Sequence, residues 1–376
     1  TVNQQETGTF VNYLDRTPTV TVCNQDGLIV FNSALRDYGE LADFLTEQLG
    51  SPSDIDPDYK SSDYSKDGEV KVLQKASKGN GIDIILMGDA YSDRLIADGT
   101  YENTMKLAME KFFATEPFKT YRELFNVYSV TAVSENEAYT TKSSTALSGY
   151  FGEDTHVGGN DCKAMEYARK AISEERMNDA VIVVMMNSMA FAGTCYMYNP
   201  IYSNVHDYFG NGTSVSYFPV GVNEEALEQL IKHEAGGHGF GKLADEYIYH
   251  NAFIQSCDCI CCSHTGAINA MKSYGFYTNI SLSGSMQEVP WSHMIYDPQY
   301  SNVVDVYEGA HMHSRGVWRS EATSCMNNNI PYYNAISREA MVKRIMKYAG
   351  EEYSFEAFKA KDYESLPSTA TTRAWE

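Results

Sequence analysis

The chain has 376 residues, of which 50 are Asp or Glu and 29 are Lys or Arg, so its formal net charge at pH 7 is −21. This acidity argues against nucleic acid or an anionic membrane as a partner, because binding to phosphate groups needs a basic face. No apolar run approaches the roughly 18 residues that a membrane-spanning helix requires. A chain of this length can bury a substantial core and hold two domains.

The N-terminal residues suggest an exported protein. The chain begins at Thr1 rather than at a methionine, so we expect that a leader has been removed. Eight cysteines are compatible with an oxidising compartment. We therefore predict a protein that is secreted or held at the cell surface or in the periplasm.

Residues 1–75 are predicted to form a small β-rich accessory domain. Residues 17–22 and 28–31 are rich in β-formers and are separated by the turn signal at 24–27. A helical segment follows near residues 38–49, and residues 51–68 have the composition of a loop or linker.

From Gly81 onward, strand and helix patterns alternate. Apolar runs at 82–87 and 181–186 are typical of interior strands, and residues 125–133 alternate like a strand. Helical spacing is found at 101–113, 162–176 and 335–348. This order predicts an α/β domain at 76–376 with a mixed, mostly parallel sheet. Residues 214–220 are expected at a sheet edge, because Pro219 cannot donate a ladder hydrogen bond.

The stretch 231–247 carries the chemistry of the chain. His233, Glu234 and His238 resemble the H-E-x-x-H consensus of zinc peptidases with one extra residue. Histidines four apart lie about 40° apart around a helix, but a spacing of five places them about 140° apart on a regular helix. Gly236 and Gly237 offer a remedy, because a π-bulge adds one residue to a turn and glycine lowers its steric cost.

Glu234 falls on the apolar stripe formed by Leu227, Leu230 and Ile231. A carboxylate on a core-facing stripe is costly unless it has a partner, and a metal-bound water would be that partner. We therefore predict a catalytic zinc site, one ion per chain, with His233 and His238 as ligands and Glu234 as general base.

The whole string resembles the family of bacterial zinc metallopeptidases named after the immunoglobulin A peptidase. The matching residues are His233, Glu234, Gly237, His238, Phe240, Gly241, Leu243, Asp245, Glu246 and Tyr247. The resemblance implies a metzincin-like fold, one zinc ion and hydrolysis of peptide bonds. The extra residue between the histidines departs from the common form of the signature.

The third protein ligand is assigned to Asp245. Gly241 lets the chain turn back after His238, and Asp245 and Glu246 follow on the return. We favour Asp245 because its shorter side chain suits a rigid ligand, while Glu246 could orient a histidine from behind. Glu246 itself and the pair His311 and His313 remain competitors, although we interpret the two histidines as cleft residues.

The resemblance also implies roles outside the motif. Met326 matches the methionine turn beneath the zinc of metzincins, and Tyr332 or Tyr333 is a candidate to stabilise the oxyanion. The strand at 214–220 is the expected partner of the substrate backbone.

Four cysteines crowd residues 257–262, at Cys257, Cys259, Cys261 and Cys262. Their close spacing differs from that of structural zinc sites, which need two well-separated pairs. Disulfides with Cys195 or Cys325 as possible partners, free thiols, and a second metal site all remain open, in that order of preference.

Together these features predict a secreted, zinc-dependent endopeptidase in which Glu234 activates a zinc-bound water. Two alternatives remain: an inactive module that keeps the metal site and binds glycan or protein, and an amide hydrolase acting on cell-wall peptides. The substrate, the cleavage preference, the oligomeric state and the role of the N-terminal domain are not determined by the sequence.

Overall fold

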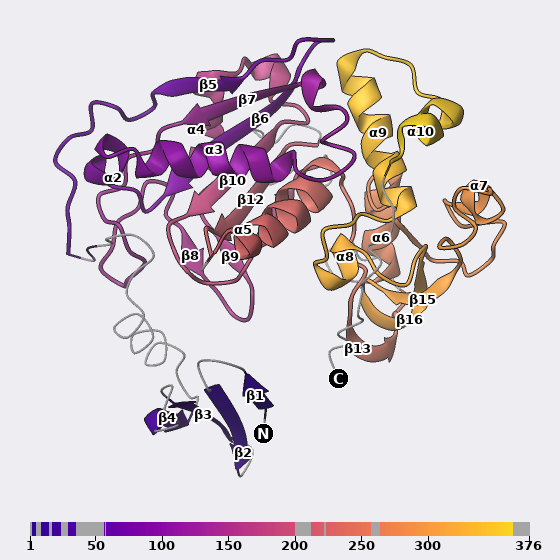
Figure 1. Ribbon diagram of the computed structural model, residues 1–376, viewed down its shortest axis with the longest axis horizontal. Coiled ribbons are helices and arrows are strands. Elements are labelled where there is room, and N and C mark those ends of the chain that lie inside the picture. The colour runs from indigo at the N-terminus through magenta and orange to yellow at the C-terminus, as the bar shows by residue number, and fades with distance from the viewer. Residues whose placement is uncertain are drawn as a thin grey trace. The chain divides into compact units, whose positions relative to one another are not determined.

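The computed structural model (Figure 1) divides into two compact units, residues 1–55 and 56–376, and each is described by itself. In the larger unit the structure describes residues 56, 58–199, 212–221, 223–256 and 264–363. In the smaller unit it describes the backbone of four strands only.

These four strands form an antiparallel sheet in chain order: β1 (Val2–Gln4), β2 (Thr9–Leu14), β3 (Thr17–Cys23) and β4 (Ile29–Ala34). The strands expected at 17–22 and 28–31 coincide with β3 and β4. The helix expected near 38–49 lies outside the described residues. The accessory domain predicted for residues 1–75 stays a prediction, and its last residues include a strand of the larger unit, β5 (Val70–Gln74).

A six-stranded sheet organises the larger unit, in the order β11-β12-β10-β6-β7-β5. β6 (Ile82–Asp89), β7 (Phe125–Val130), β10 (Val181–Met186) and β12 (Ser214–Pro219) run parallel. β5 and β11 (Thr194–Met197) pair antiparallel at the two edges. The predicted mixed, mostly parallel sheet is therefore confirmed.

The core lies on both faces of this sheet, because side chains alternate along each buried strand. Ile84 and Leu86 pack into one apolar cluster, and Ile85 and Met87 into the other. α3 (Thr100–Phe112) joins the first cluster and crosses the sheet in Figure 1, whereas α4 (Asp161–Ala171) joins the second. The helix at 224–240, which carries the H-E motif, packs on the same face as α3.

The prediction that residues 214–220 form an edge strand is wrong. β12 is paired on both sides, with β10 in parallel and with β11 antiparallel. Pro219 is tolerated there because the pairing with β11 covers only Ser214–Tyr217, so its missing N–H lies beyond the end of the neighbouring strand. The edge beside the H-E helix is formed by β11.

The remaining chain forms a smaller sheet with surrounding helices. Its strand order is β13 (Ile248–Phe253), β16 (Met312–Arg319) and β14 (Ile280–Ser281), and β15 (Tyr307–Ala310) also pairs with β16. The helices of this part are α6 (Thr265–Ser273), α7 (Ser292–Ile295), α8 (Cys325–Asn328), α9 (Ala335–Ala349) and α10 (Phe355–Lys361). The helix expected at 335–348 is thus confirmed.

The short elements are α2 (Asp93–Ala97), β8 (Tyr150–Phe151), β9 (Val157–Gly158), and single 3-10 turns at Arg122–Leu124 and Glu174–Arg176. None of the helices in the described ranges is long and apolar enough to cross a membrane.

Candidate metal centre

Three side chains converge at one point of the larger unit. Each of His233, His238 and Asp245 offers one ligand atom, and these atoms all lie within 4.8 Å of one another. Asp245 Oδ1 lies 3.0 Å from Nε2 of His233 and 3.2 Å from Nε2 of His238. The arrangement can hold one metal ion between two imidazole nitrogens and a carboxylate oxygen.

The helix that carries both histidines changes its winding before it reaches them. α5 (Glu224–Leu230) is followed without a break by a π-helix, η3 (Ile231–Phe240). A π-helix closes its hydrogen bonds between residues five apart, which brings such residues to one side. The two rings are accordingly only 4.9 Å apart between centroids. The predicted departure from α geometry is confirmed, and it extends well beyond a single bulge at Gly236–Gly237.

Both glycines are also required by close packing. A Cβ on Gly236 would lie well inside contact distance of the Tyr333 hydroxyl, and one on Gly237 would do the same with the Met326 sulfur. Both neighbouring side chains are buried. The glycines therefore allow η3 to approach the segment that holds Met326 and Tyr333, in addition to easing the change of winding.

Backbone carbonyls set the orientation of the two imidazoles. Nδ1 of His233 lies 3.2 Å from the Cys325 carbonyl oxygen, and Nδ1 of His238 lies 2.8 Å from the Leu243 carbonyl oxygen. A carbonyl only accepts, so each Nδ1 carries the proton and donates it. Nε2 of each ring is then the atom left to bind a metal ion, and it faces the point where Asp245 Oδ1 lies, as in metal sites whose ligands are held from behind.

The charges of the three groups support one another. Burial opposes the charged forms, but Asp245 and Glu234 outweigh it and raise the pKa of both His233 and His238, with a further contribution from the Cys325 carbonyl for His233. The same contacts hold the pKa of Asp245 below its usual range despite its burial. A proton thus competes with a metal ion for this centre, and metal affinity is expected to fall in acid.

Glu234 lies beside the centre without contributing to the three-atom cluster. Burial raises the pKa of its carboxyl group, and the nearby histidines oppose this rise. Gly193, in the loop before β11, packs directly against the carboxylate, since a Cβ there would stand 2.5 Å from Oε1. The sequence carried no signal for this contact, because it joins residues far apart in the chain.

The side chain of Glu246 holds neighbouring segments of the chain together. Its carboxylate accepts hydrogen bonds from Ser324 Oγ (2.5 Å), Asn279 Nδ2 (2.8 Å) and Asn334 Nδ2 (2.8 Å). It is fully buried, and its hydrogen-bond partners are Ser324, Asn279 and Asn334 rather than a histidine. The expectation that Glu246 orients a histidine is therefore not met. Instead it ties the segment after η3 to the start of α8 and α9.

The segment around α8 lies beneath the centre. Met326 is buried against Gly237, and its carbonyl accepts a hydrogen bond of 2.8 Å from the Glu246 N–H. Met326 therefore lies where the resemblance suggested, packed against η3, the helix that carries His233 and His238.

The expectation that Tyr332 or Tyr333 stabilises the oxyanion is wrong. Both side chains are buried, and both hydroxyls are already used: Tyr332 donates to Glu321 (2.8 Å) and Tyr333 to the Lys232 carbonyl (2.5 Å). Among the described residues, Tyr247 has its ring stacked on His233, with centroids 6.4 Å apart.

His311 and His313 stand next to the centre but outside the cluster of ligand atoms. The His311 N–H donates to the Asp245 carbonyl (3.0 Å), so its backbone supports that residue. His313 Nδ1 bonds the His311 carbonyl oxygen (2.7 Å). The cysteine cluster at 257–262 lies outside the described residues, and Cys195 and Cys325 are free thiols.

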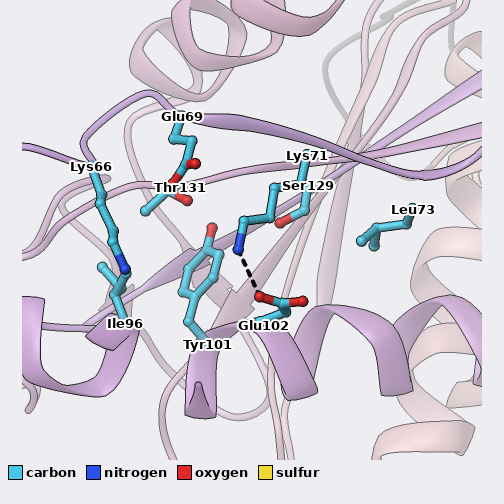
Figure 2. A pocket seen from close by; sticks show the side chains of 9 residues that line it. All are labelled: Lys66, Glu69, Lys71, Leu73, Ile96, Tyr101, Glu102, Ser129 and Thr131. Atoms are coloured by element: carbon cyan, nitrogen blue, oxygen red, sulfur yellow. Dashed lines mark hydrogen bonds and ion pairs between the residues drawn. The ribbon is translucent and has the colours of Figure 1, made fainter. Parts of the chain in front are cut away.

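A separate hollow lies between the edge strand β5 and helix α3 (Figure 2). Lys71 and Glu102 bridge it with an ion pair of 2.6 Å, and the hydroxyl of Tyr101 points into it. Its volume of about 20 Å³ has room for about one water molecule. It shares no residue with the metal centre and is too small for a substrate.

Comparison with known proteins agrees with this geometry. No curated protein matches the chain. Residues 70–256, which include the six-stranded sheet, η3 and Asp245, match the family described as IgA Peptidase M64. The match to this peptidase family implies a metal ion, and the cluster of two histidines and one aspartate is compatible with one. Residues 70–256 therefore belong to the immunoglobulin A peptidase-like family.

Proposed function

We propose that the protein is a zinc-dependent endopeptidase with its active site at His233, Glu234, His238 and Asp245. The observation that carries the proposal is the convergence of two Nε2 atoms and one carboxylate oxygen beside a buried glutamate. Three protein ligands of these types, with a fourth position left open, are the usual set of a catalytic zinc site.

The distances fit zinc. Tetrahedral bonds of about 2.0–2.2 Å place two ligand atoms about 3.3 Å apart. The observed separations of 3.0 and 3.2 Å between Asp245 Oδ1 and the two Nε2 atoms are close to this value. When bound, zinc polarises the scissile carbonyl and lowers the pKa of a bound water to about 7.

Glu234 has the chemistry of the general base. It follows His233 directly in the chain, and its raised pKa makes it a better proton acceptor than an exposed glutamate. In this proposal its carboxylate takes a proton from the attacking water and passes it to the leaving amine. Gly193 limits the positions that the carboxylate can occupy.

In this proposal the edge strand β11 holds the backbone of a peptide. Among the described residues it pairs with β12 on one side only. It begins at Thr194, directly after the glycine that touches Glu234. An extended substrate lying along β11 would therefore pass close to the base, and the substrate role expected for residues 214–220 moves to this strand.

The deciding experiment removes the base and keeps the metal. Glu234→Gln preserves size, and we expect zinc content near one equivalent with hydrolysis of unfolded protein reduced by at least about 100-fold. Glu225→Gln changes an exposed acid at the start of α5 and serves as the matched control with wild-type activity.

Activity of Glu234→Gln within a few-fold of wild type would sink the mechanism. A wild-type protein that binds zinc but cleaves only a cell-wall peptide digest would favour the amide hydrolase instead. Zinc binding without hydrolysis of either substrate would favour a binding module.

A further inference from the structure

Strand β13 is an exposed edge strand next to the metal centre. All six of its residues are exposed, and its large apolar side chains are among the most accessible in the part of the chain that the structure describes: Ile248 (48%), Tyr249 (63%) and Phe253 (60%). In the ranges that the structure covers, β13 pairs only with β16, so its second edge has no partner strand. Figure 1 shows β13 at the outer side of this small sheet.

The strand is continuous with the proposed active site. It starts three residues after Asp245. Between them lies Tyr247, whose ring stacks on His233 and lies 5.6 Å from the ring of Tyr249. A run of aromatic side chains therefore leads from a proposed metal ligand onto β13.

The composition of β13 is unusual for an unpartnered edge. Such edges are normally protected by charged residues or proline, because their free N–H and C=O groups recruit other strands. The sequence Ile-Tyr-His-Asn-Ala-Phe contains neither an acid nor a lysine nor a proline, although the chain as a whole carries 50 acidic residues. The edge thus has the features of a strand that pairs with another polypeptide.

We propose that β13 is a second substrate-binding edge, which takes up an extended segment of a protein substrate beyond the part that lies at the metal. The occupant is an unfolded or extended polypeptide with apolar or aromatic side chains, bound by strand addition and by contacts with Tyr249 and Phe253. This inference rests on the proposed peptidase function and extends it: the enzyme selects long, extended, apolar segments rather than short peptides.

Length provides the test. A four-residue peptide spans at most about 14 Å, whereas Phe253 lies five residues along the strand from Ile248, a distance of roughly 17 Å. A short substrate bound at the metal therefore cannot reach Phe253, but an unfolded protein chain can.

The experiment compares kcat/KM on a reduced, alkylated protein with kcat/KM on a four-residue peptide. For Phe253→Ser we expect the ratio of kcat/KM on the long substrate to kcat/KM on the short one to fall about tenfold, as for the loss of an aromatic contact at an interface. Tyr296→Ser changes a tyrosine beside α7 that is even more exposed (74%) and should leave the ratio at the wild-type value.

A second readout does not depend on turnover. A labelled unfolded chain should bind Glu234→Gln with an anisotropy change, and Phe253→Ser in that background should weaken the binding about tenfold. Equal losses on long and short substrates, or no loss on either, would overturn the proposal. So would loss of self-association in Phe253→Ser without a change in substrate binding, because β13 would then be a contact between two copies. A wild-type protein that hydrolyses neither substrate would instead refute the peptidase function itself.

Discussion

The neighbouring residues Asp245 and Glu246 have different partners at the metal centre. Asp245 directs its carboxylate to the two histidines, and Glu246 directs its own to Ser324, Asn279 and Asn334. Successive side chains of an extended segment point to opposite sides, so one residue faces the metal position and the next faces the core. The pair joins the geometry of the site to the packing of the segment before α9.

We therefore predict different defects for the two acids. Asp245→Asn should lose zinc affinity by more than the roughly 100-fold typical of residues behind the ligands. Glu246→Gln should retain zinc more tightly than Asp245→Asn but lower the free energy of unfolding by about 1–3 kcal/mol, because an amide N–H₂ would face buried donors. Competition with a chromogenic chelator and chemical denaturation provide the two measurements. Near-native zinc affinity in Asp245→Asn would contradict the ligand assignment.

At the scale of elements, the centre depends on how closely η3 approaches the segment around α8. Tyr333 and Met326 fill the space that Gly236 and Gly237 leave open. The predictions about this region differed in outcome according to whether they depended on local or on long-range geometry. The change of helix winding could be predicted from the spacing of the two histidines, because that argument needs only local geometry. The directions of Tyr332 and Tyr333 depend on long-range packing, which a single sequence does not encode in any local pattern.

A double-mutant cycle tests this packing. Gly236→Ala should destabilise the protein by about 1–3 kcal/mol, because the new methyl group meets the Tyr333 hydroxyl in a buried site. Tyr333→Phe removes that hydroxyl and, with it, the hydrogen bond to the Lys232 carbonyl, at a cost of about 1 kcal/mol. Thermal or chemical denaturation should show the double variant to be more stable than the sum of the two changes. Simple additivity would show that the hydroxyl is not the obstacle.

A buried carboxyl group, that of Glu321, lies at the start of α9. Glu321 is buried and accepts hydrogen bonds from Tyr332 (2.8 Å) and from the N–H of Ala335 (2.7 Å). Burial raises the pKa of Glu321 to about 7. The folded state therefore favours the protonated acid, and stability that is present below the unfolded pKa of about 4.3 is lost as the pH rises through 7.

We predict that the free energy of unfolding falls further in the wild type than in Glu321→Gln when the pH is raised from 5 to 8. The difference between the two falls should be about 3 kcal/mol, because the amide of the variant does not ionise. Denaturation of both proteins with the same zinc loading gives this difference, since the contribution of the metal cancels. Parallel pH profiles for the two proteins would show that Glu321 does not titrate in this range.

At the scale of the whole molecule, every contact described at the centre comes from residues of the larger unit. The sheet and its two faces were predictable from the buried apolar runs of β6 and β10, because such runs are specific to interior strands. The edge was not. β11 is only four residues long and has no alternating pattern, so the prediction of the edge rested on Pro219 of the neighbouring strand.

The net charge of −21 predicts a dependence on salt. A peptide substrate with lysines at both ends should be hydrolysed with a higher kcat/KM at low ionic strength, and the value should fall several-fold as salt screens the attraction. A matched peptide with glutamates at both ends should show the opposite trend. Initial rates between about 20 and 500 mM salt decide the matter, and identical responses of the two peptides would show that the net charge does not steer substrates.

The two acceptors behind the imidazoles are main-chain oxygens, of Cys325 and Leu243. The tautomer of both histidines is therefore independent of which side chains occupy those two positions. Sequence drift at 243 and 325 could replace every side-chain atom there and still leave the rings correctly presented, provided the chain path is kept. Anyone transplanting this centre into another scaffold would have to copy a backbone trace rather than a set of supporting residues.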